Sequence, residues 1–227
     1  MEPKIKHSWD LSYKEALALQ RELQKKVVLN PLPLSKISII AGADISYSKE
    51  EDINFAGVVI FSFPDLKILE KSYFISKPSF PYIPGLLVFR EGPAILEAFK
   101  KIKNIPDLIV FDGHGIAHPR GLGIASHMGV ILNIPTIGCA KSKLCGEYTE
   151  PENRVGAYSL LKYKNKVVGA VLRSKKNSKP IFISPGFMID LESSIKIIML
   201  TLRGYRIPEV TRIPHIYVNK LRENFKK

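Results

Sequence analysis

Residues 107–123, DLIVFDGHGIAHPRGLG, join a short apolar run that ends in a carboxylate to a glycine-rich loop. A continuous apolar run of this length is typical of a strand that is buried on both faces. After the loop, residues 124–132 suit a helix, and residues 136–140 suit a second buried strand that ends at Lys141. This order of strand, helix and strand predicts an α/β fold around a central sheet.

The residues before this stretch predict a helix followed by an antiparallel meander. Asp10 is the expected N-cap of an amphipathic helix over residues 10–27. Residues 37–46, 55–63 and 68–76 are β-rich and are separated by polar or proline-containing breaks, as in an antiparallel meander. The apolar face of the helix is expected to consist of Tyr13, Leu17, Leu23 and Val27.

A proline-rich loop leads from the meander into a second helix. Residues 77–85, KPSFPYIPG, contain three prolines and a glycine, which exclude regular structure and stiffen the loop. Helical spacing follows at Leu87, Glu91, Ile95 and Phe99. Because Gly92-Pro93 interrupts this pattern, we expect the helix to begin near Pro93 and Glu91 to lie at its entrance.

The C-terminal part predicts a hairpin, a strand and two helices. We expect the hairpin over residues 155–172 with its turn at Lys164-Asn165, and a strand over 181–184 that Pro185-Gly186 closes. One helix is expected from an Asp190 cap to about residue 203, and another helix or coil after Pro208. The basic tail from about residue 222 is expected to fray. No linker divides the chain, so residues 1–227 are expected to form one domain.

Composition favours a globular protein with an anionic partner. Lys plus Arg number 34 and Asp plus Glu number 21, which gives a formal net charge of +13. This excess favours a polyanion, because phosphates that Lys or Arg neutralise release condensed counterions. The N-terminus lacks the apolar stretch of a secretory signal, so we expect a cytoplasmic protein with no membrane association. Cys139 and Cys145 fit no common zinc or redox motif and are expected to be reduced, partly buried thiols.

Three carboxylates fall near the ends of the predicted elements. Asp44 lies within the first strand, Asp112 ends a later strand, and Glu91 lies between them in the sequence. Burying an ionised carboxylate is unfavourable unless a cation or hydrogen bonds compensate. A divalent metal would compensate Asp44 and Asp112 at once, and Mg²⁺ and Mn²⁺ prefer oxygen ligands. A cap, a salt bridge or a solvated strand end is the alternative for any single acid.

The order of these acids along the elements is similar to that of the ribonuclease H-like fold. We therefore expect an α/β protein with a central mixed sheet, made of an antiparallel meander plus parallel strands and flanked by helices. The glycines of residues 113–123 match neither a Walker A sequence nor a dinucleotide fingerprint. His114, His118 and His127 lack the evident tetrahedral set that a zinc site requires.

Long motifs across the chain resemble the endonuclease V family. The resemblance rests on residues 112–148, DGHGIAHPRGLGIASHMGVILNIPTIGCAKSKLCGEY, together with GADISY at 42–47, PYIPG at 81–85 and FRE at 89–91. It runs from about residue 10 to residue 222. It implies a ribonuclease H-like DNA-repair enzyme that uses Mg²⁺, or Mn²⁺ in its place. The expected reaction is hydrolysis of the second phosphodiester bond 3′ to a deaminated base, chiefly deoxyinosine, leaving 3′-hydroxyl and 5′-phosphate ends.

The resemblance also implies roles for the residues at matching positions. Asp44, Asp112 and Glu91 would hold the metal, and His215 would assist the metal site or the attacking water. Lys141 follows a buried strand and can add a fixed positive charge near the phosphate. A solvated surface position is the alternative for this lysine.

The proline-rich loop and the glycine-rich loop are the expected substrate contacts. Tyr82 lies between Pro81 and Ile83 on a rigid tip, where it can enter a duplex as a wedge or pack under its own loop. The resemblance implies the wedge. Glycines allow bare backbone groups to approach and read an extruded base. The expected substrate-binding residues are Pro81, Tyr82, Ile83, Gly85, Leu87, Gly113, Gly115, His118 and Leu144.

One departure and several alternatives remain. Relatives commonly read Ser-Pro-Gly-His where this chain has Ser184-Pro185-Gly186-Phe187, which puts any contact of that histidine in doubt. A generic ribonuclease H-like nuclease, an endonuclease for inosine-containing RNA and a binding module with structural acids are the alternative functions. The sequence does not decide between one and two metals or define activity on uracil, abasic sites or mismatches. We expect no obligate protein partner and take a monomer as the default.

Overall fold

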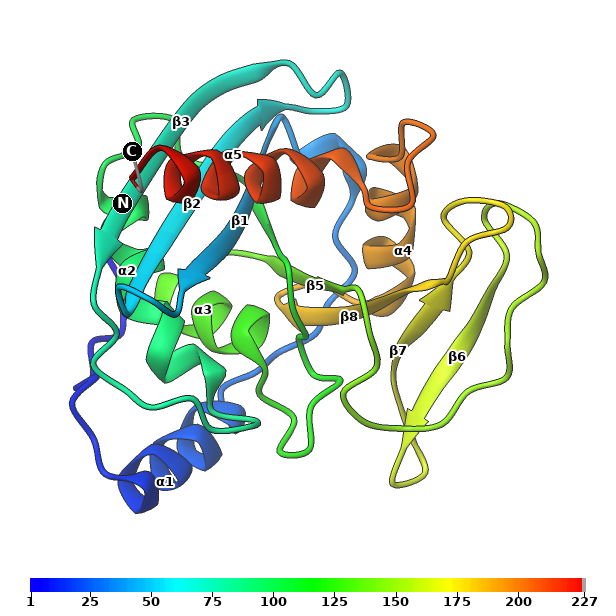
Figure 1. Ribbon diagram of the computed structural model, residues 1–227. Coiled ribbons are helices and arrows are strands. Elements are labelled where there is room, and N and C mark those ends of the chain that lie inside the picture. The colour runs from blue at the N-terminus through cyan, green and yellow to red at the C-terminus, as the bar shows by residue number, and fades with distance from the viewer. Residues whose placement is uncertain (226–227) are drawn as a thin grey trace.

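A mixed sheet forms the centre of the computed structural model, which describes residues 1–225 (Figure 1). Its strands are β1 (Ile39–Ser48), β2 (Ile53–Ser62), β3 (Ile68–Ser76), β4 (Leu108–Phe111), β5 (Thr136–Ala140), β6 (Tyr158–Tyr163), β7 (Lys166–Leu172) and β8 (Ile181–Phe187). The strand order is β3-β2-β1-β4-β5-β8-β7-β6. β1, β2 and β3 form the predicted antiparallel meander, and β4 and β5 run parallel to β1. β8, β7 and β6 continue the sheet with antiparallel pairing.

Helices cover both faces of this sheet. They are α1 (Tyr13–Gln24), α2 (Leu87–Lys100), α3 (Ile124–Leu132), α4 (Leu191–Leu200) and α5 (Glu209–Phe225), with a short 3₁₀ turn at Leu34–Lys36. α2 and α3 pack on one face with α1 outside α3, and α4 and α5 pack on the other (Figure 1). The arrangement confirms the predicted α/β class. Within residues 1–225, no helix has both the length and the apolarity to cross a bilayer.

Several elements lie where the sequence predicts them. β3, α3 and β5 have the predicted bounds, and Asp190 caps α4 by accepting a hydrogen bond from the Ser193 N–H at 2.8 Å. Lys164 and Asn165, at the hairpin turn, have φ values of 49° and 60°. Cys139 and Cys145 are free and buried, as expected.

Two helix starts differ from the predictions. α1 begins after Ser12 instead of Asp10, because Ser12 and Glu15 form a reciprocal capping box. α2 begins at Leu87 and contains Pro93 in its interior, so Glu91 lies within the helix and not at its entrance. Phe89, in the first turns of α2, is fully buried. Core packing of this kind outweighs the local preference that placed the helix start near Pro93.

Two ends in the C-terminal part also differ. β8 continues through Pro185 to Phe187, because Pro185 pairs with Ile137 beside a register shift that accommodates the proline. The tail that we expected to fray from about residue 222 stays helical to Phe225. The Phe225 ring packs edge-on against Phe55, with ring centroids 5.3 Å apart. Residues 226–227 of the predicted tail lie outside the described residues.

Glycines in β1 and β2 allow α5 to lie close to the sheet. A Cβ added to Gly42 would lie 1.6 Å from the Val210 carbonyl oxygen, and one added to Gly57 would lie 2.5 Å from Val218 Cγ1. Real side chains do not approach backbone this closely, so the crossing requires glycine at Gly42. The close crossing brings His215 of α5 against β1.

Candidate active site

Two aspartates lie side by side where β1 passes the end of β4. β1 and β4 run parallel with Ala43 opposite Phe111, so Asp44, within β1, lies beside Asp112, the first residue after β4. The Asp112 N–H donates to the Ala43 carbonyl at 3.3 Å, which extends the pairing by one residue. The side chains of Asp44 and Asp112 are 9% and 12% exposed. Two largely buried like charges with an oxygen of each within 4.8 Å of the other call for a cation.

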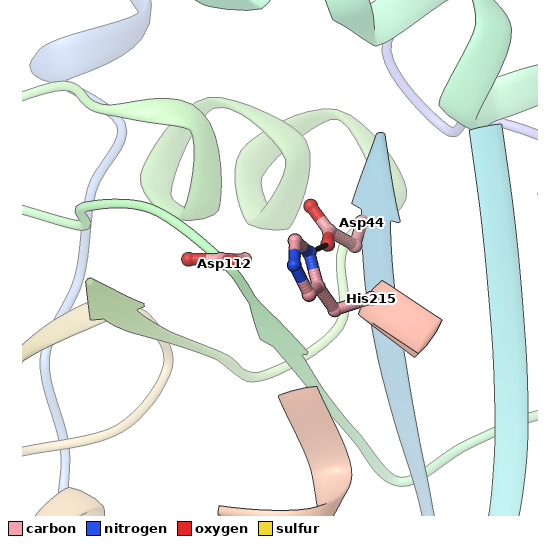
Figure 2. Close-up of side chains that lie close together, drawn as sticks. All are labelled: Asp44, Asp112 and His215. Carbon is pink, nitrogen blue, oxygen red and sulfur yellow. Dashed lines mark hydrogen bonds and ion pairs between the residues drawn. The ribbon is translucent and has the colours of Figure 1, made fainter. Parts of the chain in front are cut away.

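His215 completes a three-residue group with these aspartates, as Figure 2 shows. His215 Nδ1 donates to Asp44 Oδ2 at 2.7 Å, and Asn219 Nδ2 donates to His215 Nε2 at 3.2 Å. One possible ligand atom from each of Asp44, Asp112 and His215 lies within 4.8 Å of the other two. Within residues 1–225 no other group of His, Cys, Asp or Glu side chains has this geometry, and the other histidines form none. We call this group the acidic cluster.

Glu91 lies near the acidic cluster but not within it. Burial, together with the charges of Asp44 and Asp112, raises the pKa of the Glu91 carboxyl to about 8. Glu91 is not among the residues whose possible ligand atoms lie within 4.8 Å of one another. The structure therefore brings Asp44, Asp112 and His215 together, and Glu91 feels the charges of the two aspartates without being a member of this group.

Lys141 lies against the acidic cluster at the end of β5. Its Nζ lies 2.5 Å from Asp112 Oδ2 and 3.4 Å from His215 Nδ1. Burial and the charge of Asp44 raise the pKa of Asp112, and Lys141 opposes this rise. The Arg206 Nη2 donates to the Lys141 carbonyl at 2.7 Å and fixes the end of the strand. Lys141 is thus paired with the acidic cluster, while 36% of its side chain stays exposed.

A pocket of about 350 Å³ opens beside Asp112, beneath Tyr82. We call it the Tyr82 pocket. Asp112 and Lys141 belong both to its wall and to the surroundings of the acidic cluster, so the two sites adjoin. Of the predicted substrate-binding residues, the wall contains Tyr82, Gly85, Leu87, Gly113, His118 and Leu144. It does not contain Pro81, Ile83 or Gly115. Beside Tyr82 and Gly85, the proline-rich loop contributes Pro84 to the wall.

The carbonyl of Gly85 accepts hydrogen bonds from three side chains at the floor of the Tyr82 pocket. The donors are Gln20 Nε2 at 3.0 Å, His118 Nε2 at 3.0 Å and Arg120 Nη2 at 2.7 Å. Gln20 also donates to the Leu122 carbonyl at 2.9 Å and accepts from Arg120 Nε. Gly85 has a φ of 79°, which favours glycine. This network ties α1, the proline-rich loop and the glycine-rich loop together.

Gln20 is a site residue that the sequence analysis missed. The buried face of α1 consists of Ala16, Gln20 and Leu23, whereas Tyr13 of the predicted face is exposed. A fully buried glutamine between apolar residues at helical spacing was the available signal, since buried amides need partners.

His118 acts in this network as a neutral side chain. Burial, and then the charge of Arg120, lowers the pKa of His118 to about 4. Its Nε2–H donates to Gly85, and its Nδ1 accepts from the Arg120 N–H at 3.2 Å. Both ring nitrogens are therefore used by the protein, so His118 shapes the pocket wall through its ring.

Tyr82 projects from the rim of the pocket with 68% of its surface exposed. This exposure contradicts the alternative in which the ring packs under its own loop. Arg90 Nη1 donates to the Phe80 carbonyl at 3.0 Å and anchors the start of the loop to α2. Tyr82 is thus an aromatic side chain on a braced tip, next to a pocket.

Close packing explains two other predicted positions. A Cβ on Gly115 would lie 2.0 Å from the Pro185 carbonyl oxygen, and the Gly115 N–H donates to Ser184 Oγ at 2.8 Å. Gly115 therefore joins the glycine-rich loop to β8. Phe187 is buried among the apolar residues between the sheet and α3. The residue that replaces the usual histidine thus belongs to the core.

The fold and the acidic cluster together define a class of protein. A carboxylate within β1 beside another at the end of β4, in a sheet whose first five strands are ordered 3-2-1-4-5, is typical of metal-dependent nucleases with a ribonuclease H-like fold.

Comparisons with known proteins identify the family within this class. Residues 21–216 match the family model described as Endonuclease V. An Endonuclease V of Thermosipho melanesiensis is 46% identical over 225 residues, which cover 99% of this chain and 98% of the relative. The crystal structure of Bacillus subtilis Endonuclease V superposes with a TM-score of 0.95 at 32% identity, covering 100% and 99% of the two chains. The chain belongs to the endonuclease V family and has its ribonuclease H-like fold.

A further solved relative contains nucleic acid. Ciona intestinalis Endonuclease V is 28% identical, with a TM-score of 0.80 and coverage of 93% of this chain and 98% of that one. Its structure is a complex with a 24mer DNA that contains an inosine followed by a ribo-adenosine.

Proposed function

We propose that this endonuclease acts in DNA repair on deoxyinosine and other deaminated bases and hydrolyses the second phosphodiester bond 3′ to the lesion. The observation that carries the proposal is the junction of the two sites at Asp112. A pocket beneath an exposed aromatic side chain can hold an extruded base while the adjacent acidic cluster receives the backbone. The net charge of +13 and the inosine-containing DNA bound to the Ciona relative support the same substrate.

The donor set fits a hard divalent cation, and we propose Mg²⁺ with Mn²⁺ as a substitute. Asp44 and Asp112 would hold the ion, with Glu91 as the third carboxylate. The raised pKa values of Glu91 and Asp112 indicate an excess of negative charge that a cation would relieve. When bound, such an ion polarises the phosphate and lowers the pKa of an attacking water.

The side chains around the ion have separate tasks in this reaction. His215 donates its Nδ1 proton to Asp44, so this contact orients the carboxylate, and its Nε2 faces Asn219. Lys141 places a positive charge beside Asp112, where the scissile phosphate would develop negative charge. We propose that His215 and Lys141 belong to the catalytic set for these reasons.

Recognition of the base would use the backbone of the Tyr82 pocket. Hypoxanthine offers an O6 acceptor and an N1–H donor, so a pocket with an N–H and a carbonyl in register admits it. Adenine would leave such groups unsatisfied, at a cost of about 1–3 kcal/mol. We propose Gly85, Leu87, Gly113 and Leu144 as the base contacts, with His118 and Gly115 supporting the wall.

Tyr82 would separate the strands, with Pro81 and Ile83 stiffening its tip. An aromatic wedge fills the gap that the extruded base leaves and compensates part of the unstacking energy. The exposure of Tyr82 at the pocket rim supports this role.

A mapped cleavage assay tests the proposed function. An end-labelled duplex with one deoxyinosine is incubated with Mg²⁺ or EDTA beside an unmodified control. We expect a metal-dependent nick at the second bond 3′ to inosine. Equal cutting of both duplexes would instead support a generic nuclease, and binding without cutting would support a binding module. A matched inosine RNA substrate tests the RNA alternative, and the cytoplasmic location stays a prediction.

A further inference from the structure

A second hollow, of about 700 Å³, adjoins the acidic cluster on the other side of Lys141. Two loops, residues 141–153 and residues 173–180, line most of it. Lys141 and Ser142 belong to the walls of both this hollow and the Tyr82 pocket. We call it the Tyr148 hollow, after the aromatic side chain in its wall. Lys141 therefore stands between two recesses, with Asp112 in contact with its ammonium group.

The Tyr148 hollow is held open by contacts between its two loops. Arg173, 8% exposed, pairs with Glu150 at 2.5 Å and donates to the Pro151 carbonyl at 3.1 Å and to the Ser178 carbonyl. Asn153 and Asn177 join the same loops through two hydrogen bonds, of 2.6 and 2.7 Å. Because these bonds fix both walls, the recess is preformed.

The wall combines an aromatic ring with positive charge. Tyr148 packs edge-on against Phe182, with ring centroids 5.5 Å apart, and the Lys143 ammonium lies 5.7 Å from the centre of the Tyr148 ring. Glu150 is the acid of the wall, and its charge is taken up by Arg173. Lys141 is paired with Asp112, so Lys179 is the remaining positive charge of the wall. An aromatic platform with adjacent lysines suits the base and phosphate of single-stranded nucleic acid.

We propose that the Tyr148 hollow binds the DNA strand immediately 3′ of the scissile bond, with a base against Tyr148 and a phosphate at Lys179. This inference rests on the proposed function. If the extruded base occupies the Tyr82 pocket and the cut falls on its 3′ side at the acidic cluster, the strand runs in the 3′ direction past Lys141. The recess that continues beyond Lys141 is the Tyr148 hollow. It holds the segment that carries the new 5′-phosphate after cleavage.

Single-turnover cleavage with substrates of different flank length tests the assignment. One deoxyinosine duplex extends ten nucleotides beyond the cut on the 3′ side, and a second ends in a single abasic nucleotide beyond the cut, which leaves neither a base for Tyr148 nor a further phosphate for Lys179; the 5′ flanks are equal. Tyr148→Ala and Lys179→Gln should each raise the half-saturating enzyme concentration about tenfold on the long substrate, from lost stacking or phosphate contact. Neither should change it on the short substrate, and the maximal rate should be retained.

Three controls make the result decisive. Tyr148→Phe keeps the ring and should behave as wild type. Lys67→Gln removes an exposed lysine in the turn between β2 and β3, at the opposite end of the sheet, and should have no effect that depends on flank length. Unchanged melting temperatures would establish that Tyr148→Ala and Lys179→Gln are folded.

The outcomes separate the two proposals. If the wild-type enzyme cuts at inosine but the two variants are affected equally on both substrates, or on neither, the Tyr148 hollow does not bind the 3′ strand. If the wild-type enzyme does not cut at inosine, the proposed function is wrong and this assignment is overturned with it.

Discussion

Asp112 separates two regions that are held together in different ways. On one side, Asp44 and Asp112 lie close together, and burial and like charge raise the pKa values of Asp112 and Glu91. On the other side, Gln20, His118 and Arg120 converge on the carbonyl of Gly85 and satisfy one another's hydrogen bonds. The carboxylates of the acidic cluster repel one another, whereas the polar groups around Gly85 in the Tyr82 pocket already have hydrogen-bond partners.

The difference indicates how each region responds to change. A cation would remove the repulsion in the acidic cluster, so its function should depend on metal and pH. The Tyr82 pocket depends on hydrogen bonds that the protein's own groups complete, including those from the Arg120 guanidinium, so its function should depend on packing and be largely independent of metal. Variants of the acidic cluster should therefore lose cleavage rate, and variants of the network at Gly85 should lose the preference for inosine.

Removing a carboxylate of the acidic cluster should have the largest effect. We expect Asp112→Asn to lower the single-turnover rate at deoxyinosine by about 10³-fold, which corresponds to about 4 kcal/mol of lost transition-state stabilisation. Binding to the same duplex in EDTA should be retained, because the substitution removes negative charge and keeps the size of the side chain that Asp112 contributes to the wall of the Tyr82 pocket. Fluorescence anisotropy and a quenched cleavage assay measure the two quantities. Loss of binding together with cleavage would show that the two regions are not separable.

Removing hydrogen bonds to the Gly85 carbonyl should have a smaller effect, on the preference for inosine and not on the metal dependence. Gln20→Leu removes two donated hydrogen bonds and leaves the Gly85 and Leu122 carbonyls with fewer partners. We expect the preference for inosine over unmodified DNA to fall roughly 10- to 100-fold, as for a loss of about 1–3 kcal/mol. The Mg²⁺ concentration for half-maximal rate should stay the same.

Gln24→Leu is the matched control for this variant. Gln24 lies one turn further along α1, and its side chain is exposed. The same chemical change there should leave both the preference for inosine and the metal dependence unaltered. A shift in metal dependence for Gln20→Leu, absent in Gln24→Leu, would contradict the separation of the two regions.

The sequence predicts the acidic cluster better than it predicts the network at Gly85. Asp44 and Asp112 lie in or at the end of apolar strands, where a buried charge is conspicuous, and parallel pairing of the strands brings them together. His215 lies more than 100 residues further along the chain, and only the resemblance to the family pointed to it. Its position depends on Gly42, whose missing side chain admits the backbone of α5.

The network at Gly85 was harder to predict because its parts come from three distant segments. Gln20, Gly85 and Arg120 show no shared spacing, and hydrogen bonds to a backbone carbonyl leave no pattern in side-chain chemistry. The start of α2 was misplaced for a related reason. Pro93 is a strong local signal, but burial of Phe89 in the core decides where the helix begins.

The smallest effect concerns pH and the stability of the metal-free protein. The folded protein holds the Glu91 pKa at about 8, above the value of 4.5 for an unperturbed glutamate, so it binds the proton more tightly than the unfolded chain does. Stability from this group is therefore complete below pH 4.5 and declines as pH rises to about 8. In EDTA, the melting temperature of the wild type should fall through this window by about 2–4 °C for each kcal/mol lost.

Glu91→Gln tests this linkage, because the amide cannot ionise. Its melting temperature in EDTA should decline less between pH 5 and pH 8 than that of the wild type, and the remaining slope reports other groups such as Asp112, whose pKa is also raised. Saturating Mg²⁺ should flatten the wild-type curve, since the cation replaces the proton as the partner of the carboxylates. Parallel curves for the wild type and Glu91→Gln in EDTA would show that Glu91 is already ionised at neutral pH. The acidic cluster would then balance its charge through Lys141, without the proton on Glu91.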